Sequence, residues 1–300
     1  MNSNTINIFF LGKGGVGKST SSALTALHLV NSGKKVLLAS MDPAHNQSDI
    51  LQIKLSEKSK EIRPNFFAKE VDVNYWVKKY LDDVTSQIKH SYSYLTAFNL
   101  ESYLDVIKFS PGIEEYALLT AYKEIRKTNP DKDYIIFDMP PTALTLKFLG
   151  LPKISNLWLE KLLDLRNKIL KKKEIITKIQ LGKKEVEHDK ILNKLNTQIT
   201  SYSNVKTVFE NEIQTVLNLV MNTDKLSFSE SNLIVENLKG LNLKISNIFI
   251  NKYSEGFNTK DIENTFDIKG MQIFPNSAIP LLGLETLSQY LKSIDIFIDF

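Results

Sequence analysis

The chain has 300 residues and a mass of 34.2 kDa, and its 42% hydrophobic and 24% charged content is that of a folded globular protein rather than a disordered one. The net charge is +4, but almost all positive charges are lysines and only Arg63, Arg126 and Arg166 are arginines, which argues against a nucleic-acid-reading surface. The lack of cysteine excludes disulfides, thiol chemistry and cysteine-ligated zinc.

The N-terminal residues have no basic region followed by an apolar core, which a secretory signal would need. Nowhere does an apolar stretch reach the roughly 18 residues that a membrane-spanning helix requires. We therefore expect a cytoplasmic protein without an integral membrane segment, and we do not expect nucleic acid as its partner.

A phosphate-binding loop follows the first predicted strand, Ile6 to Leu11, and precedes a helical pattern from Ser19 to Val30. The loop is a complete GxxxxGKS motif, made of Gly12, Lys13, Gly14, Gly15, Val16, Gly17, Lys18, Ser19 and Thr20. Its glycines let successive N–H groups converge on phosphate oxygens, and Lys18 is expected to neutralise the β and γ phosphates. Ser19 is the expected magnesium ligand, because Mg²⁺ takes oxygen donors. The alternative is a glycine-rich turn with a chance lysine, but the strand, loop and helix patterns agree.

A second lysine, Lys13, comes directly after the first glycine of the loop. The form KGGVGKS resembles the deviant phosphate loop of the SIMIBI class of ATPases. That resemblance implies a homodimer in which Lys13 reaches phosphates bound by the partner subunit, where an arginine finger serves in other NTPases. A solvated lysine in a polar loop is the alternative.

A second strand is predicted from Lys35 to Ser40, and Pro43 stops any helix after it. The stretch from Asp42 to Asn46 then lies at the C-terminal end of a strand, which is the edge where open parallel sheets bind ligands. Asp42 is therefore well placed for chemistry on a bound nucleotide.

Two long, lysine-rich stretches, roughly residues 56–128 and 144–204, have apolar residues at helical spacing and predict helical insertions. We find no internal repeat, second phosphate loop or low-complexity linker. We therefore expect one nucleotide domain over residues 1–300, interrupted by a helical subdomain. The predicted fold class is α/β, a P-loop NTPase with a mostly parallel, doubly wound sheet flanked by helices.

A third strand, Asp133 to Asp138, resembles a Walker B strand, because aromatic and β-branched residues precede a terminal carboxylate. Asp138 would hold magnesium through water, and Met139 to Thr142 would form a loop that senses the γ-phosphate. An aspartate that caps the next helix is the alternative.

Two later strands, Thr215 to Met221 and Ile245 to Ile250, are each followed by an asparagine. The second asparagine, Asn251, begins the sequence NKYS, which approaches the NKxD pattern of guanine readers but lacks its aspartate. ATP is therefore the expected nucleotide.

The order of these motifs resembles the ArsA family, which contains the arsenical pump-driving ATPases and the guided-entry ATPases that carry tail-anchored membrane proteins. The likeness rests on KGGVGKST, DPAHN, FSPGIEE and FDMPPTALTLKFLGLP, and it runs from about Ile8 to Leu291. It implies a magnesium-dependent ATPase. By position, Asp42 matches the switch I aspartate that orients and polarises the attacking water, and His45 and Asn46 match the same switch.

The resemblance also assigns residues around the base. Asn251 matches the family's adenine-contacting asparagine, and Asp224 falls where an acidic nucleotide contact occurs. Pro275 falls where backbone beside a proline packs on the adenine ring. Residues 111–115 match the PGxxE element that links the helical part to the site. Plain strand-end turns are the alternative for Asn251 and Asp224.

The chain departs from the family pattern in ways that concern its partner. It has no cysteine for the zinc-binding CxxC pair of eukaryotic guided-entry ATPases or for the thiolates that bind metalloids in the pump ATPases. The stretch from Lys171 to Lys190 contains no methionine, whereas the client-binding helix of the guided-entry branch is rich in it. The size of the helical insertions still favours a protein client or a membrane-protein machine.

Two other functions stay open. A partitioning ATPase of the ParA or MinD groups shares KGGVGKS and acts on DNA or a membrane surface. Those groups lack DPAHN, and the membrane type ends in a basic amphipathic helix, whereas this sequence ends SIDIFIDF. A metabolic enzyme that phosphorylates or ligates a small molecule is the third candidate, because fold likeness alone does not decide function.

Overall fold

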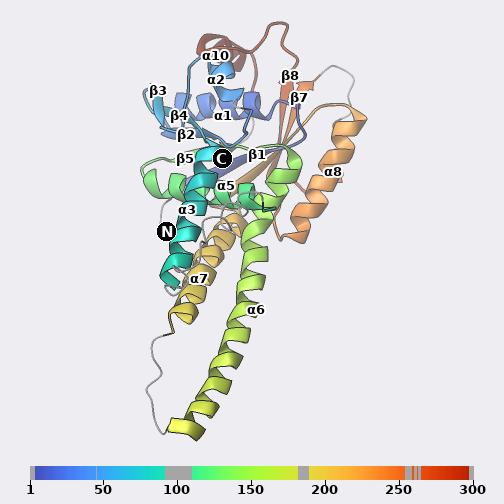
Figure 1. Ribbon diagram of the computed structural model, residues 1–300. Coiled ribbons are helices and arrows are strands. Elements are labelled where there is room, and N and C mark those ends of the chain that lie inside the picture. The colour runs from blue at the N-terminus through green and yellow to red at the C-terminus, as the bar shows by residue number, and fades with distance from the viewer. Residues whose placement is uncertain are drawn as a thin grey trace.

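The computed structural model describes residues 4–44, 46–91, 110–181, 189–253, 259, 262 and 265–296. In this part of the chain, eight strands form one sheet in the order β3-β4-β2-β5-β1-β6-β7-β8 (Figure 1). The strands are β1 (Ile6–Leu11), β2 (Val36–Ser40), β3 (Lys60–Arg63), β4 (Phe66–Glu70), β5 (Tyr134–Asp138), β6 (Thr215–Met221), β7 (Asn247–Tyr253) and β8 (Gly270–Pro275). All neighbouring strands are parallel except the edge pair of β3 and β4.

Helices cover both faces of the sheet, which confirms the doubly wound α/β fold predicted from the sequence. One face packs against α1 (Lys18–Asn31), α2 (Asn46–Leu51) and α10 (Leu284–Lys292). The other packs against α3 (Val73–Ser91), α5 (Ile113–Thr128), α6 (Thr142–Leu181), α7 (Lys190–Glu210) and α8 (Lys225–Gly240). Since successive strand residues point to opposite faces, Phe10 of β1 enters the first core and Phe9 the second.

The central strands bring their carboxyl ends to one edge of the sheet. In register, Asp138 of β5 lies between Phe10 of β1 and Ser40 of β2. Strands β5 and β2 lie on one side of β1, and β6 lies on its other side, so the strand order changes direction at β1. Open α/β sheets bind ligands at such a switch point, outside the carboxyl ends of the strands.

The first predicted helical stretch, residues 56–128, does not start with a helix. It starts with β3 and β4, an antiparallel hairpin whose turn contains Pro64 and Asn65, the latter with a φ of 66°. β4 then extends the sheet by pairing in parallel with β2. A Pro-Asn turn between two short runs is a hairpin signal, and the helical interpretation of residues 60–70 was wrong. The edge strand β8 also falls outside the strands predicted from the sequence.

Helices α6 and α7 form an arm that extends away from the sheet in Figure 1. α6 has 40 residues, and Arg166 within it pairs with Asp189 at 2.9 Å. The Asp189 carboxylate also caps α7 by accepting the N–H groups of Ile191 and Leu192. In the described ranges, no helix combines the length and the apolar character that a membrane span requires.

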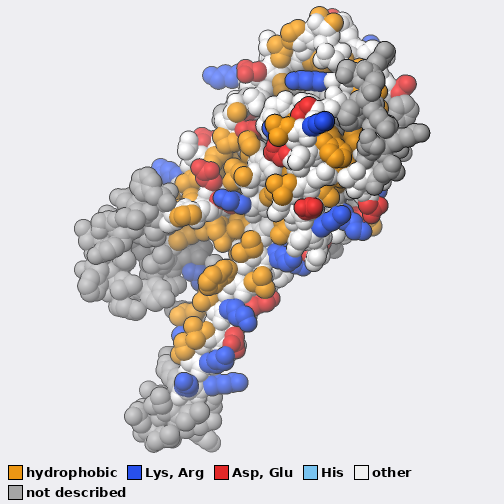
Figure 2. Space-filling view, turned by 90° about the vertical axis from the view of Figure 1, so that its right-hand side faces the viewer, with side chains coloured by type: hydrophobic (Ala, Val, Ile, Leu, Met, Phe, Trp, Pro, Cys, Tyr) orange, Lys and Arg blue, Asp and Glu red, His pale blue; other side chains and the backbone are white. Residues whose placement is uncertain are grey.

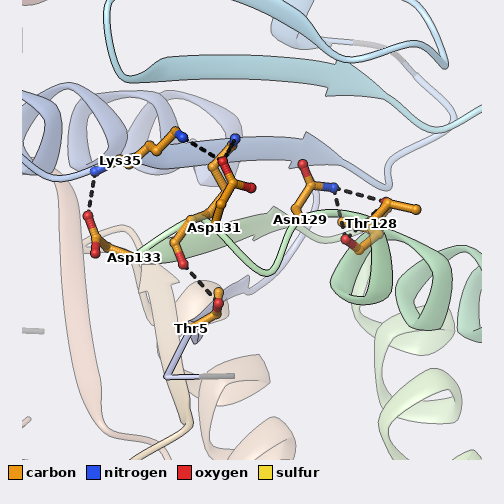
Figure 3. A network of polar contacts seen from close by, with 8 residues as sticks. Thr5, Lys35, Thr128, Asn129, Asp131 and Asp133 are labelled. Atoms are coloured by element: carbon orange, nitrogen blue, oxygen red, sulfur yellow. Dashed lines mark hydrogen bonds and ion pairs between the residues drawn. The ribbon is translucent and has the colours of Figure 1, made fainter. Parts of the chain in front are cut away.

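At the opposite edge of the sheet, where the strands begin, polar residues form a network of hydrogen bonds and ion pairs (Figure 3). The backbone N–H of Lys35 donates to the Asp133 carboxylate at 2.7 Å, and the Lys35 ammonium pairs with Asp131. Hydrogen bonds from the side chains of Lys35 and Lys132 lower the pKa of Asp131 to about 2. The Thr5 hydroxyl donates to the carbonyl of Lys132 at 2.8 Å. These contacts tie together the starts of β1, β2 and β5.

Candidate nucleotide site

The loop between β1 and α1 has a backbone shape that requires its glycines. Gly12, Gly15 and Gly17 have φ angles of 143°, 80° and 95°, in the left-handed region. A Cβ on Gly12 would lie 2.3 Å from the carbonyl oxygen of Val220, and a Cβ on Gly17 would lie 2.0 Å from Nδ2 of Asn251. No side chain caps α1 at Gly17. The first N–H groups of α1 therefore have no capping side chain, which leaves them available to an anion.

Lys18 supplies the buried positive charge of the loop. The residue is 5% exposed, and its Nζ donates to the carbonyl of Lys13 at 3.2 Å. Burial lowers the pKa of Lys18, while the carboxylates of Asp138, Asp42 and Glu230 counteract that effect. The ammonium group therefore lies within electrostatic reach of both carboxylates predicted for the site.

Asp138 is fully buried at the end of β5. Its Oδ2 accepts a hydrogen bond from Nε2 of Gln47 at 3.0 Å, while its Oδ1 has no hydrogen-bond partner within the described residues. Burial raises the pKa of Asp138 to about 6, and Ser19, Gln47 and Lys18 oppose the rise. A buried carboxylate oxygen without a partner, close to a hydroxyl group, fits a magnesium ion that takes oxygen donors and retains several waters.

Asp42 follows β2 at the same edge of the sheet. It is 8% exposed, and its Oδ1 accepts the backbone N–H of Ala44 at 3.0 Å, which gives the loop the form of an Asx turn. Its charge acts on the pKa values of Lys18 and Asp138. His45 lies outside the described residues, and Asn46 begins α2. The role of Asp42 in hydrolysis stays a prediction.

Lys13 contacts its own chain through Glu230 of α8, with 3.8 Å between Nζ and Oε2. The other carboxylate oxygen, Oε1, accepts the hydroxyl of Thr142 at 3.1 Å, and Thr142 is the first residue of α6. Glu230 thus joins the phosphate loop to the segment that follows Asp138. The sequence did not single out Glu230, since only the fold brings α8 to the loop. The reach of Lys13 to a partner subunit stays a prediction.

Gln47 of α2 is a second site residue that the sequence did not single out. It is fully buried, and its Nε2 lies within 3.0 Å of acceptors on Ser19, Ser22 and Asp138. The available signal was a polar residue five positions after Asp42. With only six residues, α2 is too short for a periodic pattern to show which of its faces is buried.

The three predicted base contacts lie near the carboxyl ends of β6, β7 and β8. Asn251 donates from Nδ2 to the carbonyl of Val16 at 2.8 Å, so it supports the phosphate loop. Asp224 caps α8, and Pro275 ends β8, where its carbonyl accepts the Tyr290 hydroxyl at 2.6 Å. The fold brings the three residues to one edge, and their contacts with a base stay predictions.

The PGIEE element, residues 111–115, forms the start of α5. Gly112 precedes the helix with a φ of 91°, and buried Glu115 pairs with Lys147 of α6 at 3.3 Å. The pair joins α5 to the first turns of α6, which begin where the segment after Asp138 ends.

The chain is similar to known ATPases over most of its length. The model of the anion-transporting ATPase family, the ArsA ATPases, matches residues 5–272. A protein assigned as an arsenical pump-driving ATPase in Aquifex aeolicus (strain VF5) is 31% identical over 301 residues, which cover 95% of this chain and 97% of that protein. ATPase get3 of Schizosaccharomyces japonicus is 31% identical over 251 residues, which cover 82% of this chain and 74% of that protein. An ATPase ASNA1 homolog of Entamoeba dispar is 28% identical over 255 residues, with 82% and 75% covered. The chain therefore belongs to the anion-transporting ATPase family and is an ATP hydrolase.

Proposed function

We propose that the protein is a magnesium-dependent ATPase that works as a homodimer and couples ATP hydrolysis to a protein client or a membrane-protein partner. The observation that carries the proposal is the convergence, at the carboxyl edge of the sheet, of Lys18 of α1, Asp42 in the loop after β2, and Asp138 of β5. One buried cation beside carboxylate and hydroxyl oxygens suits a nucleoside triphosphate with hydrated magnesium.

Each residue has a distinct part in hydrolysis. Lys18 and the loop N–H groups bind the phosphates and neutralise charge that develops during phosphoryl transfer. Asp42 orients and polarises the attacking water. Magnesium, when bound, would neutralise further phosphate charge, with Ser19 as its direct ligand and Asp138 acting through water.

The homodimer part of the proposal is supported by the weakness of the ion pair that Lys13 makes within its own chain. Its side chain is 32% exposed, and the 3.8 Å ion pair with Glu230 (28% exposed) contributes about 0–1 kcal/mol at most. A triphosphate on a second subunit carries several negative charges and competes readily for such an ammonium group. The dimer then closes on ATP and opens after hydrolysis.

The client part is supported by the outer face of α6. Besides the side that packs on α7, the helix carries a row of apolar side chains that are exposed among the described residues, mostly spaced three to four residues apart: Ile154, Leu157, Trp158, Leu162, Leu165 and Ile169. These residues are 44–68% exposed, and Figure 2 shows hydrophobic side chains along the arm. Such a row on a helix suits an apolar or amphipathic segment of a protein client.

The test is hydrolysis and assembly of the purified protein in the presence of magnesium and ATP. The wild-type protein is expected to release phosphate and to sediment as a dimer when ATP is bound. The Asp42→Asn variant should still bind ATP and dimerise, but should hydrolyse it at least ~100-fold more slowly. A wild-type protein that neither hydrolyses ATP nor dimerises, or an Asp42→Asn variant with the wild-type rate, would contradict the proposal.

The trapped Asp42→Asn variant also gives access to the partner. Purified with magnesium and ATP from its native cells, it should retain a protein that is lost when Trp158 and Leu165 of the apolar row are both changed to Asp. Recovery of DNA or lipid instead would favour the partitioning class of ATPase.

A further inference from the structure

Gln47 links three elements of the candidate site through one amide group. Its Nε2 lies 2.9 Å from the carbonyl oxygen of Ser19, 2.9 Å from Oγ of Ser22 and 3.0 Å from Oδ2 of Asp138. Ser19 and Ser22 belong to the start of α1, Asp138 ends β5, and Gln47 belongs to α2. The side chain therefore joins the phosphate-loop helix and the buried carboxylate to the helix that follows Asp42.

The hydrogen-bond inventory around Gln47 leaves several acceptors without a donor. An amide NH₂ has two protons, and it faces three acceptors here. Within the described residues, Oε1 of Gln47 and Oδ1 of Asp138 are buried and have no partner. The hydroxyl of Ser40, beside Asp138 in the sheet register, is also buried without a partner there, and it can donate as well as accept. The Ser19 side chain also hydrogen-bonds to the Asp138 carboxylate. Buried acceptors are seldom left unpaired in native proteins, so the remaining oxygens of Gln47 and Asp138 suit further donors such as metal-bound water.

Contacts other than this amide also anchor α2. Ile50 and Leu51 of α2 are buried in the core on the α1 side of the sheet. The carboxylate of Glu70, at the end of β4, accepts both the N–H and the hydroxyl of Ser48 at 2.8 Å. The amide of Gln47 is instead directed at Asp138 and the phosphate-loop helix.

We propose that Gln47 is a positioning residue for the magnesium ion. By binding Oδ2 of Asp138 it leaves Oδ1 free to accept hydrogen bonds from magnesium-bound water, and its own Oε1 is a further acceptor for such water. Because α2 follows Asp42 along the chain, the contact also couples the cation to the switch aspartate. The inference rests on the proposed magnesium-dependent ATPase site and names a further residue of it.

The test measures how tightly the full-length protein, with ADP, binds Mn²⁺ as a paramagnetic substitute for Mg²⁺, by electron paramagnetic resonance. Gln47→Met keeps an unbranched side chain of similar size but removes the amide donors and the acceptor. We expect the Mn²⁺ affinity to fall about 10-fold, which is typical when a residue that hydrogen-bonds to a metal-binding group is removed. ADP affinity in EDTA should stay at the wild-type value. Gln52→Met, at the exposed position just after the end of α2, is the matched control and should bind Mn²⁺ like the wild type.

Wild-type Mn²⁺ affinity in a folded Gln47→Met variant would overturn the assignment. If that variant does not fold, Gln47→Asn is measured in the same way, because its side chain is one methylene shorter and draws the amide back. Wild-type Mn²⁺ affinity in Gln47→Asn would then overturn the assignment. Asp138→Asn separates this inference from the proposed function. If the wild type binds no Mn²⁺ with ADP, the magnesium site itself fails; if Asp138→Asn binds more weakly while Gln47→Met matches the wild type, only the role of Gln47 fails.

Discussion

Asp138 is the site carboxyl group whose pKa is raised by burial, to about 6. The same group titrates near pH 4 in an unfolded chain, so the folded protein holds this proton more tightly than the unfolded one. The resulting contribution to stability is fully present below about pH 4 and is lost as the pH rises through 6. At neutral pH the nucleotide-free protein therefore carries an ionised, buried Asp138 at a cost in folding free energy.

The Asp138→Asn variant should remove that cost. In EDTA at pH 7.5, its free energy of unfolding is expected to exceed that of the wild type by about 1–3 kcal/mol, because two pKa units correspond to ~3 kcal/mol at most. The difference should shrink at pH 5, where the folded wild-type carboxyl group is mostly protonated. Urea unfolding at both pH values measures it, and a difference that is independent of pH would refute the electrostatic explanation.

A second residue-scale prediction concerns Gly17. Its φ is 95°, and an added Cβ would lie 2.0 Å from Nδ2 of Asn251, so Gly17→Ala must displace the hydrogen bond from Asn251 to Val16. We expect a loss of about 1–3 kcal/mol in unfolding free energy. Gly14→Ala is the control, since nothing lies within 4 Å of its added Cβ, and should change stability by no more than about 0.5 kcal/mol. Equal urea unfolding curves for the two variants would show that the loop is not held in this way.

Single residues were predictable where the motif is contiguous. The order of glycines and lysines from Gly12 to Lys18 already implies an anion-binding turn, and the φ angles agree with it. Gln47 and Glu230 were not predictable, because each acts on residues far away in the sequence. Their contacts exist only once α2 and α8 have packed beside the loop.

At the scale of elements, the strands that could be predicted from the sequence are those that are buried on both faces. β2, β5 and β6 are covered on both faces, so their sequences are nearly continuous apolar runs that are easily recognised. β3 and β8 lie at the two edges of the sheet and are partly exposed: β3 is mostly charged, and β8 is a short run between a glycine and a proline, so neither shows a clear apolar pattern. The hairpin of β3 and β4 was not predicted because it lies within a stretch whose apolar residues are otherwise spaced as in a helix.

The start of α7 gives an element-scale prediction. Asp189 caps this helix and also pairs with Arg166 of α6, so it fixes where the two helices of the arm meet. Asp189→Ala should lower the unfolding free energy by about 1 kcal/mol and speed amide hydrogen exchange at Ile191 and Leu192. Asp189→Asn keeps a capping oxygen but loses the charge, so its effect should be smaller. The same exchange rates in both variants and the wild type would rule out the cap as the anchor.

At the scale of the whole molecule, the contacts form a continuous path from the phosphate loop to the arm. Lys13 meets Glu230 of α8, Glu230 accepts a hydrogen bond from Thr142, and Thr142 begins α6. A nucleotide that draws Lys13 away from Glu230 therefore changes what holds the start of the longest described helix. The fold and the ATPase family followed from contiguous motifs, whereas an apolar row on α6 is too general a surface to identify a partner from the sequence.

The central claim is that two subunits share each triphosphate, with Asp42 acting in its own subunit and Lys13 acting across the interface. Mixing Lys13→Ala and Asp42→Asn subunits tests it most directly, since each variant alone should be inactive. A mixed dimer has one complete site, which combines Asp42 of the first variant with Lys13 of the second. At equal amounts, half of the dimers are mixed and half of their sites are complete, so about a quarter of the wild-type ATPase rate should return. A mixture that stays as inactive as its components would contradict the account.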